Sequence, residues 1–204
     1  MGKYLTKVET DFIRTSVDLS GARMIMDVGA EAGRFSQLSA DDRTSVVSID
    51  IDSYGLKRLR QKMTRVDVVQ ADARSLPFKD GTFDAIFMIE VLDYIPQLDT
   101  VLSECHRTLK QGTSLILSFG NNSSLKARLR KIGGKSYQHS YRRVVLSLQR
   151  GNLAVRRKTG YNWLPFGRMS ENPLISTLSW VERAFGFRRI PSLSPWVLIR
   201  AEKT

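Results

Sequence analysis

The stretch Met24-Ile25-Met26-Asp27-Val28-Gly29-Ala30-Glu31-Ala32-Gly33-Arg34-Phe35 decides the fold of this chain. An apolar run ends in Asp27, and two glycines four residues apart follow before a helical pattern begins. This order predicts a buried strand, a tight turn and a helix N-terminus. Gly29 allows the sharp turn, and Gly33 allows the first helical turn to approach a ligand or the sheet. The free N–H groups of a helix start favour an anionic or carboxylate-bearing ligand, most often a nucleotide-type cofactor.

The turn differs from the dinucleotide-binding fingerprint. That fingerprint needs Gly-x-Gly-x-x-Gly, whereas the spacing here is Gly29-x-x-x-Gly33. A strand–turn–helix unit without any ligand would show the same local pattern, so the interpretation depends on the rest of the chain.

The length of 204 residues allows one full core, and we expect a single domain over residues 1–204. The one cysteine, Cys105, excludes an internal disulfide framework and fits a reducing, cytoplasmic setting. The sequence shows no apolar run as long as a membrane span and no signal peptide. We therefore expect a cytoplasmic protein, with peripheral membrane attachment as an open alternative.

The net charge of +12 is concentrated in one third of the chain. Residues 105–170 contain 14 Lys or Arg and no Asp or Glu. Such a basic segment favours an anionic partner, either a phospholipid surface, a nucleic acid or a phosphorylated substrate. A solvated basic face without a specific partner is the competing interpretation.

Short apolar runs alternate with helical patterns along most of the chain, which is typical of an α/β fold with helices on both faces of a mostly parallel sheet. We expect seven strands, with the last one antiparallel, at residues 24–28, 46–50, 66–70, 83–89, 114–119, 153–158 and 196–201. We expect helices at residues 3–18, 33–40, 53–63, 98–109, 125–132, 140–149 and 173–185. Ser53 and Ser140 are the expected N-caps, and Gln111-Gly112 is expected to end the helix over 98–109.

Four acidic residues fall at or just after the ends of predicted strands: Asp27, Asp50, Asp72 and Glu90. Ligands of such folds bind beyond the carboxyl ends of the strands, so these side chains should lie in one layer. Beyond the fifth strand, segments 120–140 and 160–195 carry aromatic and basic residues, and we expect them to contribute substrate or lid contacts.

The chain resembles the class I methyltransferases that use S-adenosylmethionine, most closely over residues 20–119 and in topology beyond them. The closest similarity is to the group acting on small molecules and lipids, and it implies a Rossmann-like fold. The resemblance rests on the order of several motifs, namely Asp27-Val28-Gly29 with Gly33, the acid Asp50, Ala71-Asp72-Ala73, Leu76-Pro77-Phe78 and Glu90-Val91-Leu92-Asp93-Tyr94-Ile95.

The resemblance implies roles for individual residues. Asp50 would accept hydrogen bonds from both ribose hydroxyls of the cofactor, with Asp52 as a rival, and Asp72 would accept from the adenine amino group. Asp27 and Glu90 would lie near its methionine end. The implied cofactor-binding set is Asp27, Gly29, Ala30, Glu31, Gly33, Asp50, Ile51, Asp72, Ala73 and Glu90.

Glu31 departs from the family pattern, which usually has a third glycine at this position. A glutamate costs little if the backbone is ordinary there and more if φ is positive. Its charge could repel the cofactor's carboxylate or meet its cationic groups. We therefore expect weakened rather than abolished cofactor binding.

Candidates for catalysis are few. Methyl transfer needs alignment and exclusion of water, and a base only where the acceptor must lose a proton. His139 is the candidate base and Tyr94 a candidate pocket residue, and no metal cluster is visible. No Asn/Asp-Pro-Pro-Tyr/Phe tetrad follows the fourth strand, which argues against methylation of nucleic-acid bases.

Three functions remain open from the sequence. The first is methyl transfer to a small or lipid-linked, anionic acceptor. The second is RNA or DNA methylation that uses the basic segment. The third is a non-catalytic binding protein on the same fold. The sequence defines neither the methyl acceptor nor the oligomeric state.

Overall fold

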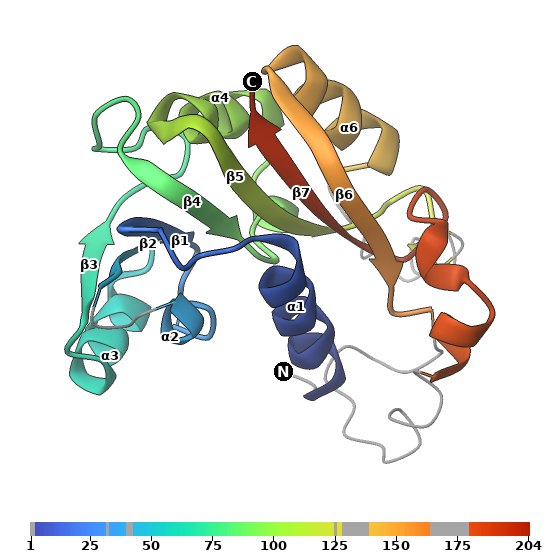
Figure 1. The fold of residues 1–204 in the computed structure, drawn as a ribbon, viewed down its shortest axis with the longest axis horizontal. Helices are drawn as coiled ribbons and strands as arrows, with labels where there is room; N and C mark the ends of the chain where they lie inside the picture. Colours follow the sequence, from blue (N-terminus) through green and yellow to red (C-terminus); the bar gives the residue numbers. More distant parts are fainter. Residues whose placement is uncertain (1–2, 32, 40–42, 125, 128–138, 164–179) are drawn as a thin grey trace.

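The computed structural model describes residues 3–31, 33–39, 43–124, 126–127, 139–163 and 180–204. Seven strands form one sheet in the order β3-β2-β1-β4-β5-β7-β6 (Figure 1). Their bounds are β1 Met24–Val28, β2 Ser45–Asp50, β3 Val66–Gln70, β4 Phe83–Met88, β5 Leu109–Gly120, β6 Leu153–Tyr161 and β7 Trp196–Lys203. The first five strands pair in parallel, and β7 is antiparallel to both of its neighbours, β5 and β6. The predicted α/β sheet with an antiparallel last strand is therefore confirmed.

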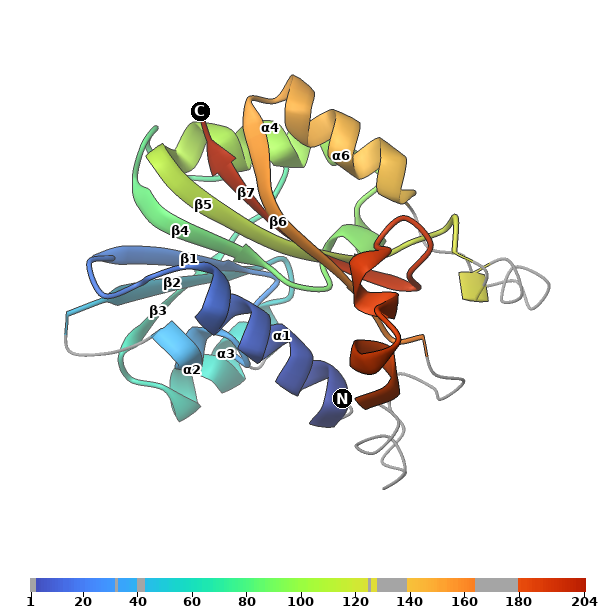
Figure 2. The same cartoon turned by 45° about the vertical axis from the view of Figure 1, so that its right-hand side comes forward.

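Helices cover both faces of the sheet (Figures 1 and 2). Alternate residues of β1 show the two layers, because Met26 packs in the core with α4 (Leu98–Thr108) and α6 (Tyr141–Arg150), while Ile25 packs against α1 (Lys3–Ser16). The helix α3 (Ser53–Lys62) contributes Leu59 to a third cluster with the edge of β2. Cys105 of α4 is fully buried in this core, as expected for a structural cysteine. Among the described helices, none is both long and apolar enough to cross a membrane.

The end of α4 agrees with the prediction to within one residue, but β5 begins five residues earlier than predicted. The helix ends at Thr108, and β5 begins immediately at Leu109, where Gln111-Gly112 had been expected to end the helix. Leu109 pairs with Phe83, and the next pair is Ser114 with Ala85, so the residues between them bulge out of the ladder. The pairing of Leu109 with β4 outweighs the local helical and turn pattern.

Helix caps are partly as predicted. Ser140 caps α6, since its hydroxyl accepts from the Arg143 N–H at 3.2 Å. Asp52, and not Ser53, caps α3, because its carboxylate accepts from the backbone N–H groups of Tyr54 and Gly55. A carboxylate also interacts favourably with the positive end of the helix dipole, which explains the preference for Asp52.

Some predicted helices are shorter or lie outside the described residues. The helix expected over 33–40 is reduced to α2, Ser36–Ser39. Most of the helices expected at 125–132 and 173–185, and much of the segments 120–140 and 160–195, fall outside the described residues. Within the second of these segments, residues 180–184 are helical, and a short 3-10 helix, η2, covers Phe187–Arg189.

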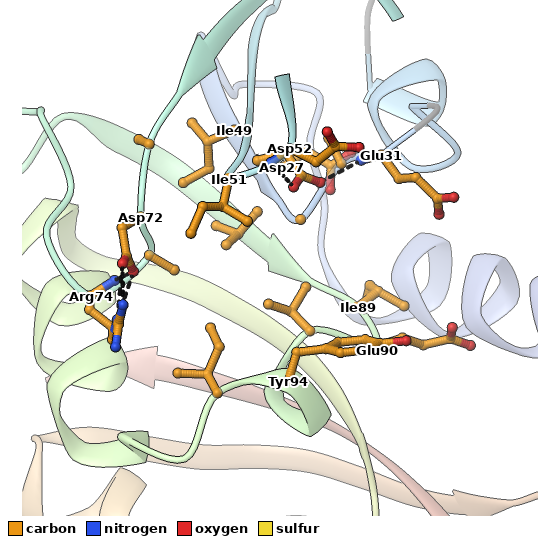
Figure 3. Close-up of a pocket in the computed structure, with 18 of the residues that line it drawn as sticks. Asp27, Glu31, Ile49, Ile51, Asp52, Asp72, Arg74, Ile89, Glu90 and Tyr94 are labelled. Atoms are coloured by element: carbon orange, nitrogen blue, oxygen red, sulfur yellow. Dashed lines mark hydrogen bonds and ion pairs between the residues drawn. The ribbon is translucent and has the colours of Figure 1, made fainter. Parts of the chain in front are cut away.

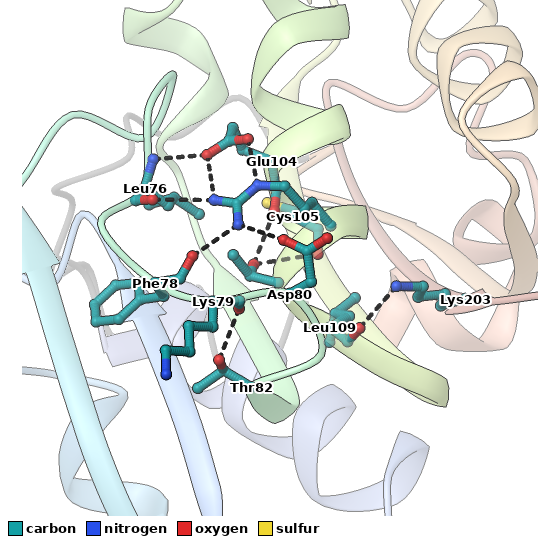
Figure 4. A network of polar contacts seen from close by, with 11 residues as sticks. Leu76, Phe78, Lys79, Asp80, Thr82, Glu104, Cys105, Leu109 and Lys203 are labelled. Carbon is teal, nitrogen blue, oxygen red and sulfur yellow. Dashed lines mark hydrogen bonds and ion pairs between the residues drawn. The ribbon is translucent and has the colours of Figure 1, made fainter.

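A clasp around Arg107 joins the loop after β3 to α4. The guanidinium donates to both oxygens of Glu104, to the carbonyls of Leu76 and Phe78, and to Asp80, at 2.7–3.0 Å. Glu104 in turn accepts from the Leu76 N–H at 2.7 Å. Figure 4 shows these partners gathered between the loop and the helix. The clasp holds the loop that follows Asp72 and Ala73 in place.

Candidate cofactor site

A cavity of about 840 Å³ opens beyond the carboxyl ends of β1, β2, β3 and β4 (Figure 3). This volume lies in the range of small-molecule and cofactor sites. The four predicted carboxylates line it together with two arginines, and the acidic and basic lining residues are Asp27, Glu31, Asp50, Asp52, Asp72, Glu90, Arg34 and Arg74. The other predicted cofactor-binding residues that line the cavity are Gly29, Ala30, Ile51 and Ala73. Gly33 is the one member of the predicted set that does not line it.

The turn after β1 is built on a left-handed glycine. Gly29 has φ 69°, and the N–H groups of Gly29 and Ala30 both donate to the Ile49 carbonyl of β2, at 2.8 and 3.1 Å. A Cβ atom at Gly29 would lie 2.4 Å from Cγ2 of Val91. The turn is therefore pinned between β2 and the segment after β4, and only glycine fits there.

Gly33 serves packing and does not line the cavity. Its φ is 76°, and a Cβ atom there would lie 2.2 Å from Cδ1 of Leu59 in α3. The close approach of the turn to α3 thus depends on the second glycine of the motif. The sequence predicted an approach to a ligand or to the sheet, whereas the structure shows an approach to α3.

Glu31 has a positive φ of 44°, so it takes the backbone conformation for which glycine is favoured. Its N–H donates to Oδ2 of Asp50 at 3.0 Å, which ties the turn to the end of β2. The side chain is exposed, and Figure 3 shows it directed away from Asp27 and Asp52. The departure from the family pattern therefore carries backbone strain.

Asp50 and Asp52 are distinguished by their partners. Both oxygens of Asp52 accept from the first turn of α3. Asp50 accepts from the Glu31 and Asp52 N–H groups, one on each oxygen, and each carboxylate oxygen retains a second lone pair. This leaves Asp50 oriented at the strand end and able to accept further hydrogen bonds.

Asp72 lies at the opposite end of the cavity from Glu31 and Glu90 (Figure 3). It forms an ion pair with Arg74, with Nη2 2.6 Å from Oδ2, and the Arg74 hydrogen bonds lower the pKa of the Asp72 carboxyl. Ile51, which also lines the cavity, is 68% exposed. An exposed isoleucine beside this polar pair offers an apolar surface to a flat ring.

Asp27 is buried at the bottom of the turn. Burial raises the pKa of its carboxyl to about 6, and the hydrogen bond from the Ser36 hydroxyl, at 2.5 Å, opposes that rise. Ser36 is itself 2.8 Å from the Ser48 hydroxyl of β2. The carboxylate is thus held by α2 and β2 as well as by its own strand.

Glu90 follows β4 and is unusual in its backbone. It has φ 65°, is 5% exposed, and its N–H donates to the Ser118 hydroxyl of β5 at 2.9 Å. Its Oε2 lies 3.7 Å from Nη2 of Arg34. A buried carboxylate on a strained residue at a cavity wall is a feature of functional sites.

The sequence did not single out Arg34, which lines the cavity, or Glu9, which forms an ion pair with Arg34. Nη1 of Arg34 lies 3.2 Å from Oε2 of Glu9, which is fully buried. Glu9 belongs to α1 and is four residues from both Leu5 and Ile13, so it lies on the apolar face of this helix. A charged residue on that face was the sequence feature that could have indicated a buried ion pair.

The two catalytic candidates lie in different places. Tyr94, in the 3-10 helix η1 (Leu92–Tyr94), lines the cavity and is 76% exposed. His139 is 1% exposed and is not among the lining residues; its Nε2 is 2.8 Å from the Ile95 carbonyl. Burial lowers the pKa of His139. Within the described part of the chain, no group of three or more His, Cys, Asp or Glu is arranged to hold a metal ion.

Comparison with known proteins places this cavity in a family. Residues 26–117 match a family model described as a methyltransferase domain. Over these residues, which make up less than half of the chain, this protein is similar to that domain. The match begins in β1 and ends in β5, so it contains the four strand ends that surround the cavity.

Curated relatives of the methyltransferase domain include a ubiquinone biosynthesis O-methyltransferase from Xanthomonas oryzae pv. oryzae, 31% identical over 137 residues, which are 64% of this chain and 56% of the relative. Another of the same name, from Xylella fastidiosa, is 31% identical over 136 residues, 64% of this chain and 55% of the relative. The chain thus spans little more than half the length of the curated relatives it matches.

Solved structures share the fold over nearly the whole chain. An S-adenosylmethionine-dependent methyltransferase from Mesorhizobium loti matches with a TM-score of 0.72 at 16% identity, covering 97% of this chain and 99% of that one. A geranyl diphosphate C-methyltransferase from Streptomyces coelicolor, solved with S-adenosyl-L-homocysteine, matches with a TM-score of 0.70 at 17% identity, covering 98% and 81%. The predicted Rossmann-like fold is confirmed by these structures. The match of residues 26–117 to a methyltransferase domain supports the predicted class I family and its cofactor, S-adenosylmethionine.

Proposed function

We propose that this protein transfers a methyl group from S-adenosylmethionine to the hydroxyl of a small-molecule acceptor. The observation that carries the proposal is the single cavity in which the glycine turn meets Asp50, Asp72 and Glu90 from the ends of neighbouring strands. The hydroxyl acceptor is suggested by the O-methyltransferase relatives, which match 64% of the chain.

The lining residues fit this cofactor. Asp50 would accept from the ribose hydroxyls, because its two oxygens can bind a vicinal diol. Asp72 would accept from the adenine amino group, with Ile51 and Ala73 beside the ring. The excess of acidic over basic residues suits a cofactor that carries a sulfonium and an ammonium against one carboxylate.

The chemistry asks little of the protein beyond alignment. When bound, S-adenosylmethionine supplies a methyl group on a good leaving group. Transfer to a hydroxyl would leave S-adenosylhomocysteine behind, and the acceptor would release its proton to water at the mouth of the cavity. The cavity walls hold the donor and exclude water. Tyr94 lines the cavity and stays our candidate for contact with the acceptor, whereas buried His139 is the weaker of the two candidates.

The support for an anionic acceptor comes from the basic segment outside the cavity, and not from the cavity lining. The cavity is mainly acidic, so it does not itself favour an anion near the methyl donor. The exposed face of α6 carries Arg142, Arg143 and Arg150. An anionic or lipid-linked acceptor, or an anionic membrane surface as a partner, would therefore contact this outer face.

Titration calorimetry with S-adenosylmethionine tests the proposal first. Binding at micromolar to sub-millimolar concentration, followed by mass-spectrometric detection of methylated phenols and catechols with and without a prenyl chain, would support it. If no heat is measured at millimolar cofactor, the proposal is wrong and the non-catalytic binding protein on the same fold is favoured.

The partner of the basic face needs a separate measurement. Sedimentation with anionic vesicles, absent with neutral ones, would support a membrane surface. Steep salt-dependent binding to generic RNA or DNA would instead favour the nucleic-acid alternative. The triple variant R142Q/R143Q/R150Q should lose either interaction and keep cofactor binding.

A further inference from the structure

Large apolar side chains are exposed together in the segment before β7. Nine such side chains are exposed in the described part of the chain, and five of them fall within residues 180–193. These five, which we call the apolar patch, are 37–69% exposed: Trp180, Phe185, Phe187, Ile190 and Leu193. Single exposed apolar residues are ordinary on a protein surface, whereas a cluster of them marks a site of interaction.

The apolar patch is held in a defined position. The rings of Phe185 and Phe187 stack with their centroids 6.2 Å apart. The side-chain amide of Asn121, directly after β5, donates to the carbonyls of Ser192 and Ser194 at 2.9 and 3.0 Å. The segment is therefore tied to the end of the sheet, and its apolar side chains are exposed on a fixed support.

The charge that accompanies the apolar patch is positive. Arg183 and Arg189 are exposed between its members. The one acid of residues 180–193, Glu182, is fully buried, where it accepts from the Tyr4 hydroxyl and lies 3.8 Å from Nε of Arg188. Because its carboxylate faces inward, it does not offset the two exposed arginines, and the segment is complementary to an anionic surface.

The apolar patch and the cofactor cavity lie at the same end of the sheet. Trp196, which follows the segment, pairs with Gly120 at the carboxyl end of β5. Strand β5 is parallel to β4, and the cavity lies beyond the carboxyl end of β4. Figures 1 and 2 show the segment, coloured orange-red, beside that end of β6 and close to the N-terminal part of α1. A surface that receives the apolar patch would therefore bring this end of the molecule towards it.

We propose that the apolar patch docks this protein on an anionic phospholipid surface. Its apolar side chains enter the interface between head groups and acyl chains, and Arg183 and Arg189 contact the lipid phosphates. This contact differs from attraction by the basic face of α6, because it buries apolar surface. It deepens the proposed function, on which one part of it rests: a lipid-linked acceptor would approach the cavity from the bilayer.

Other occupants fit the apolar patch less well. Aromatic rings beside arginines can stack on nucleic-acid bases, but Ile190 and Leu193 have no ring with which to stack. A second copy of the chain, related by a twofold axis, would bring Arg183 and Arg189 of both copies to one interface. Lipid is the partner that uses both the aliphatic and the cationic side chains.

Sedimentation with vesicles of phosphatidylcholine and phosphatidylglycerol tests the docking surface. The double variant Phe185→Ala/Leu193→Ala should lower the partition coefficient roughly 10- to 100-fold, because two apolar side chains no longer leave water. Arg183→Gln/Arg189→Gln should instead reduce the preference for these vesicles over pure phosphatidylcholine, roughly fivefold for each charge.

Tyr54→Ala is the matched control. Tyr54 is 67% exposed, against 69% for Phe185, but it belongs to α3 and lies outside the apolar patch. Since interfacial binding scales with the apolar area that is buried, this variant should bind vesicles within about twofold of the wild type. Equal thermal unfolding of all variants, followed by circular dichroism, shows that each is folded.

Fluorescence locates the contact independently. Brominated phosphatidylcholine quenches a tryptophan that enters the bilayer, so mixed with phosphatidylglycerol it should quench the wild type. Trp180→Phe should lose most of this quenching and keep vesicle binding within about twofold, because phenylalanine retains most of the apolar area. Trp196 is buried in β7 and should contribute little to the quenching.

The outcomes separate this inference from the proposed function. If Phe185→Ala/Leu193→Ala binds vesicles as the wild type does, or if the wild type binds none, the docking surface is wrong. It is also wrong if Phe185→Ala instead abolishes binding to poly(U) RNA, or dissolves a dimer in sedimentation velocity. Calorimetry with S-adenosylmethionine needs no vesicles, so loss of cofactor binding would refute the proposed function and leave the vesicle result standing.

Discussion

At the scale of single residues, Glu31 combines a positive φ with an exposed acidic side chain at the rim of the cavity. We expect Glu31→Gly to stabilise the protein by about 1 kcal/mol, because relief of left-handed strain exceeds the entropy cost of glycine at such a position. The same change should tighten S-adenosylmethionine binding severalfold. Chemical denaturation and calorimetry would measure the two effects.

Glu31→Gln and Glu31→Ala separate strain from charge. Both remove the carboxylate and keep a Cβ atom, so they should reproduce any gain in affinity that comes from charge and none of the gain in stability. Equal stability of Glu31→Gly and Glu31→Ala would show that the backbone at this position is not strained.

Gly29 is the residue on which the turn depends most directly. Gly29→Ala should destabilise the protein by about 2–4 kcal/mol, since φ is 69° and the new methyl group would meet Val91 at 2.4 Å. The measurement is thermal or urea unfolding. Adding Val91→Ala should recover the part of the lost stability that comes from the steric clash, but not the part that comes from the positive φ.

Gly21→Ala is the matched control for that substitution. A Cβ atom there would meet nothing within 4 Å. We expect it to change the free energy of unfolding by less than about 1 kcal/mol. A similar loss in both variants would contradict the steric argument for Gly29.

Some residues of the site could be predicted from the sequence and others could not. Asp27, Asp50, Asp72 and Glu90 could be predicted because each follows an apolar strand, and parallel strands bring their ends to one edge. Arg34 and Glu9 could not be paired from sequence, because their contact depends on how α1 crosses the sheet.

At the scale of elements, the Arg107 clasp links two segments that the sheet does not connect. Arg107→Ala should destabilise the protein by about 2–3 kcal/mol, because it leaves Glu104 and two loop carbonyls without their charged donor. Hydrogen exchange of the loop over residues 74–81 should accelerate more than that of the strands.

Arg156→Ala provides the comparison. Arg156 also forms an ion pair, at 3.0 Å with Glu202, but its side chain is 49% exposed. A solvent-exposed pair contributes about 0–1 kcal/mol, so this variant should unfold almost as the wild type does. Equal effects of the two substitutions would mean that the clasp acts as an ordinary surface ion pair.

Element types were predicted better than their limits. The strand Val66–Gln70 matches its prediction because apolar residues and breakers mark both of its ends. The start of β5 does not, because the decisive interaction is the pairing of Leu109 with Phe83 in a distant strand. Local patterns carry no information about such pairing.

At the scale of the whole molecule, the two ends of the chain are joined through buried carboxylates. Tyr4 of α1 donates to Glu182, which also accepts from the Trp163 N–H at 2.7 Å, and Tyr161 of β6 donates to Glu9. The two contacts made by α1 span more than 150 residues of sequence, beyond the reach of periodicity or motif arguments. The sheet itself was predictable because alternating strands and helices allow few topologies.

The pH dependence of global stability provides a test of buried charge. Burial raises the pKa of Asp93 to about 7, against the hydrogen bonds from the Gly120 N–H. In the unfolded chain an aspartate titrates near about 3.9. The folded state therefore binds the extra proton between these values, so the stability that protonation provides is fully present below the unfolded pKa and is lost as pH rises through about 7.

Asp93→Asn should remove this dependence. At pH 8 we expect the variant to be about 1–2 kcal/mol more stable than the wild type, because an amide avoids the cost of a buried charge and still accepts from Gly120. The gain should shrink as pH falls towards 5. Asp67→Asn, on an exposed position of β3, removes the same charge and should show no such trend. Urea unfolding of all three proteins between pH 5 and 8 measures the effect. Parallel curves for wild type and Asp93→Asn would contradict it, because the other buried acids, including Asp27 with a pKa of about 6, are common to both.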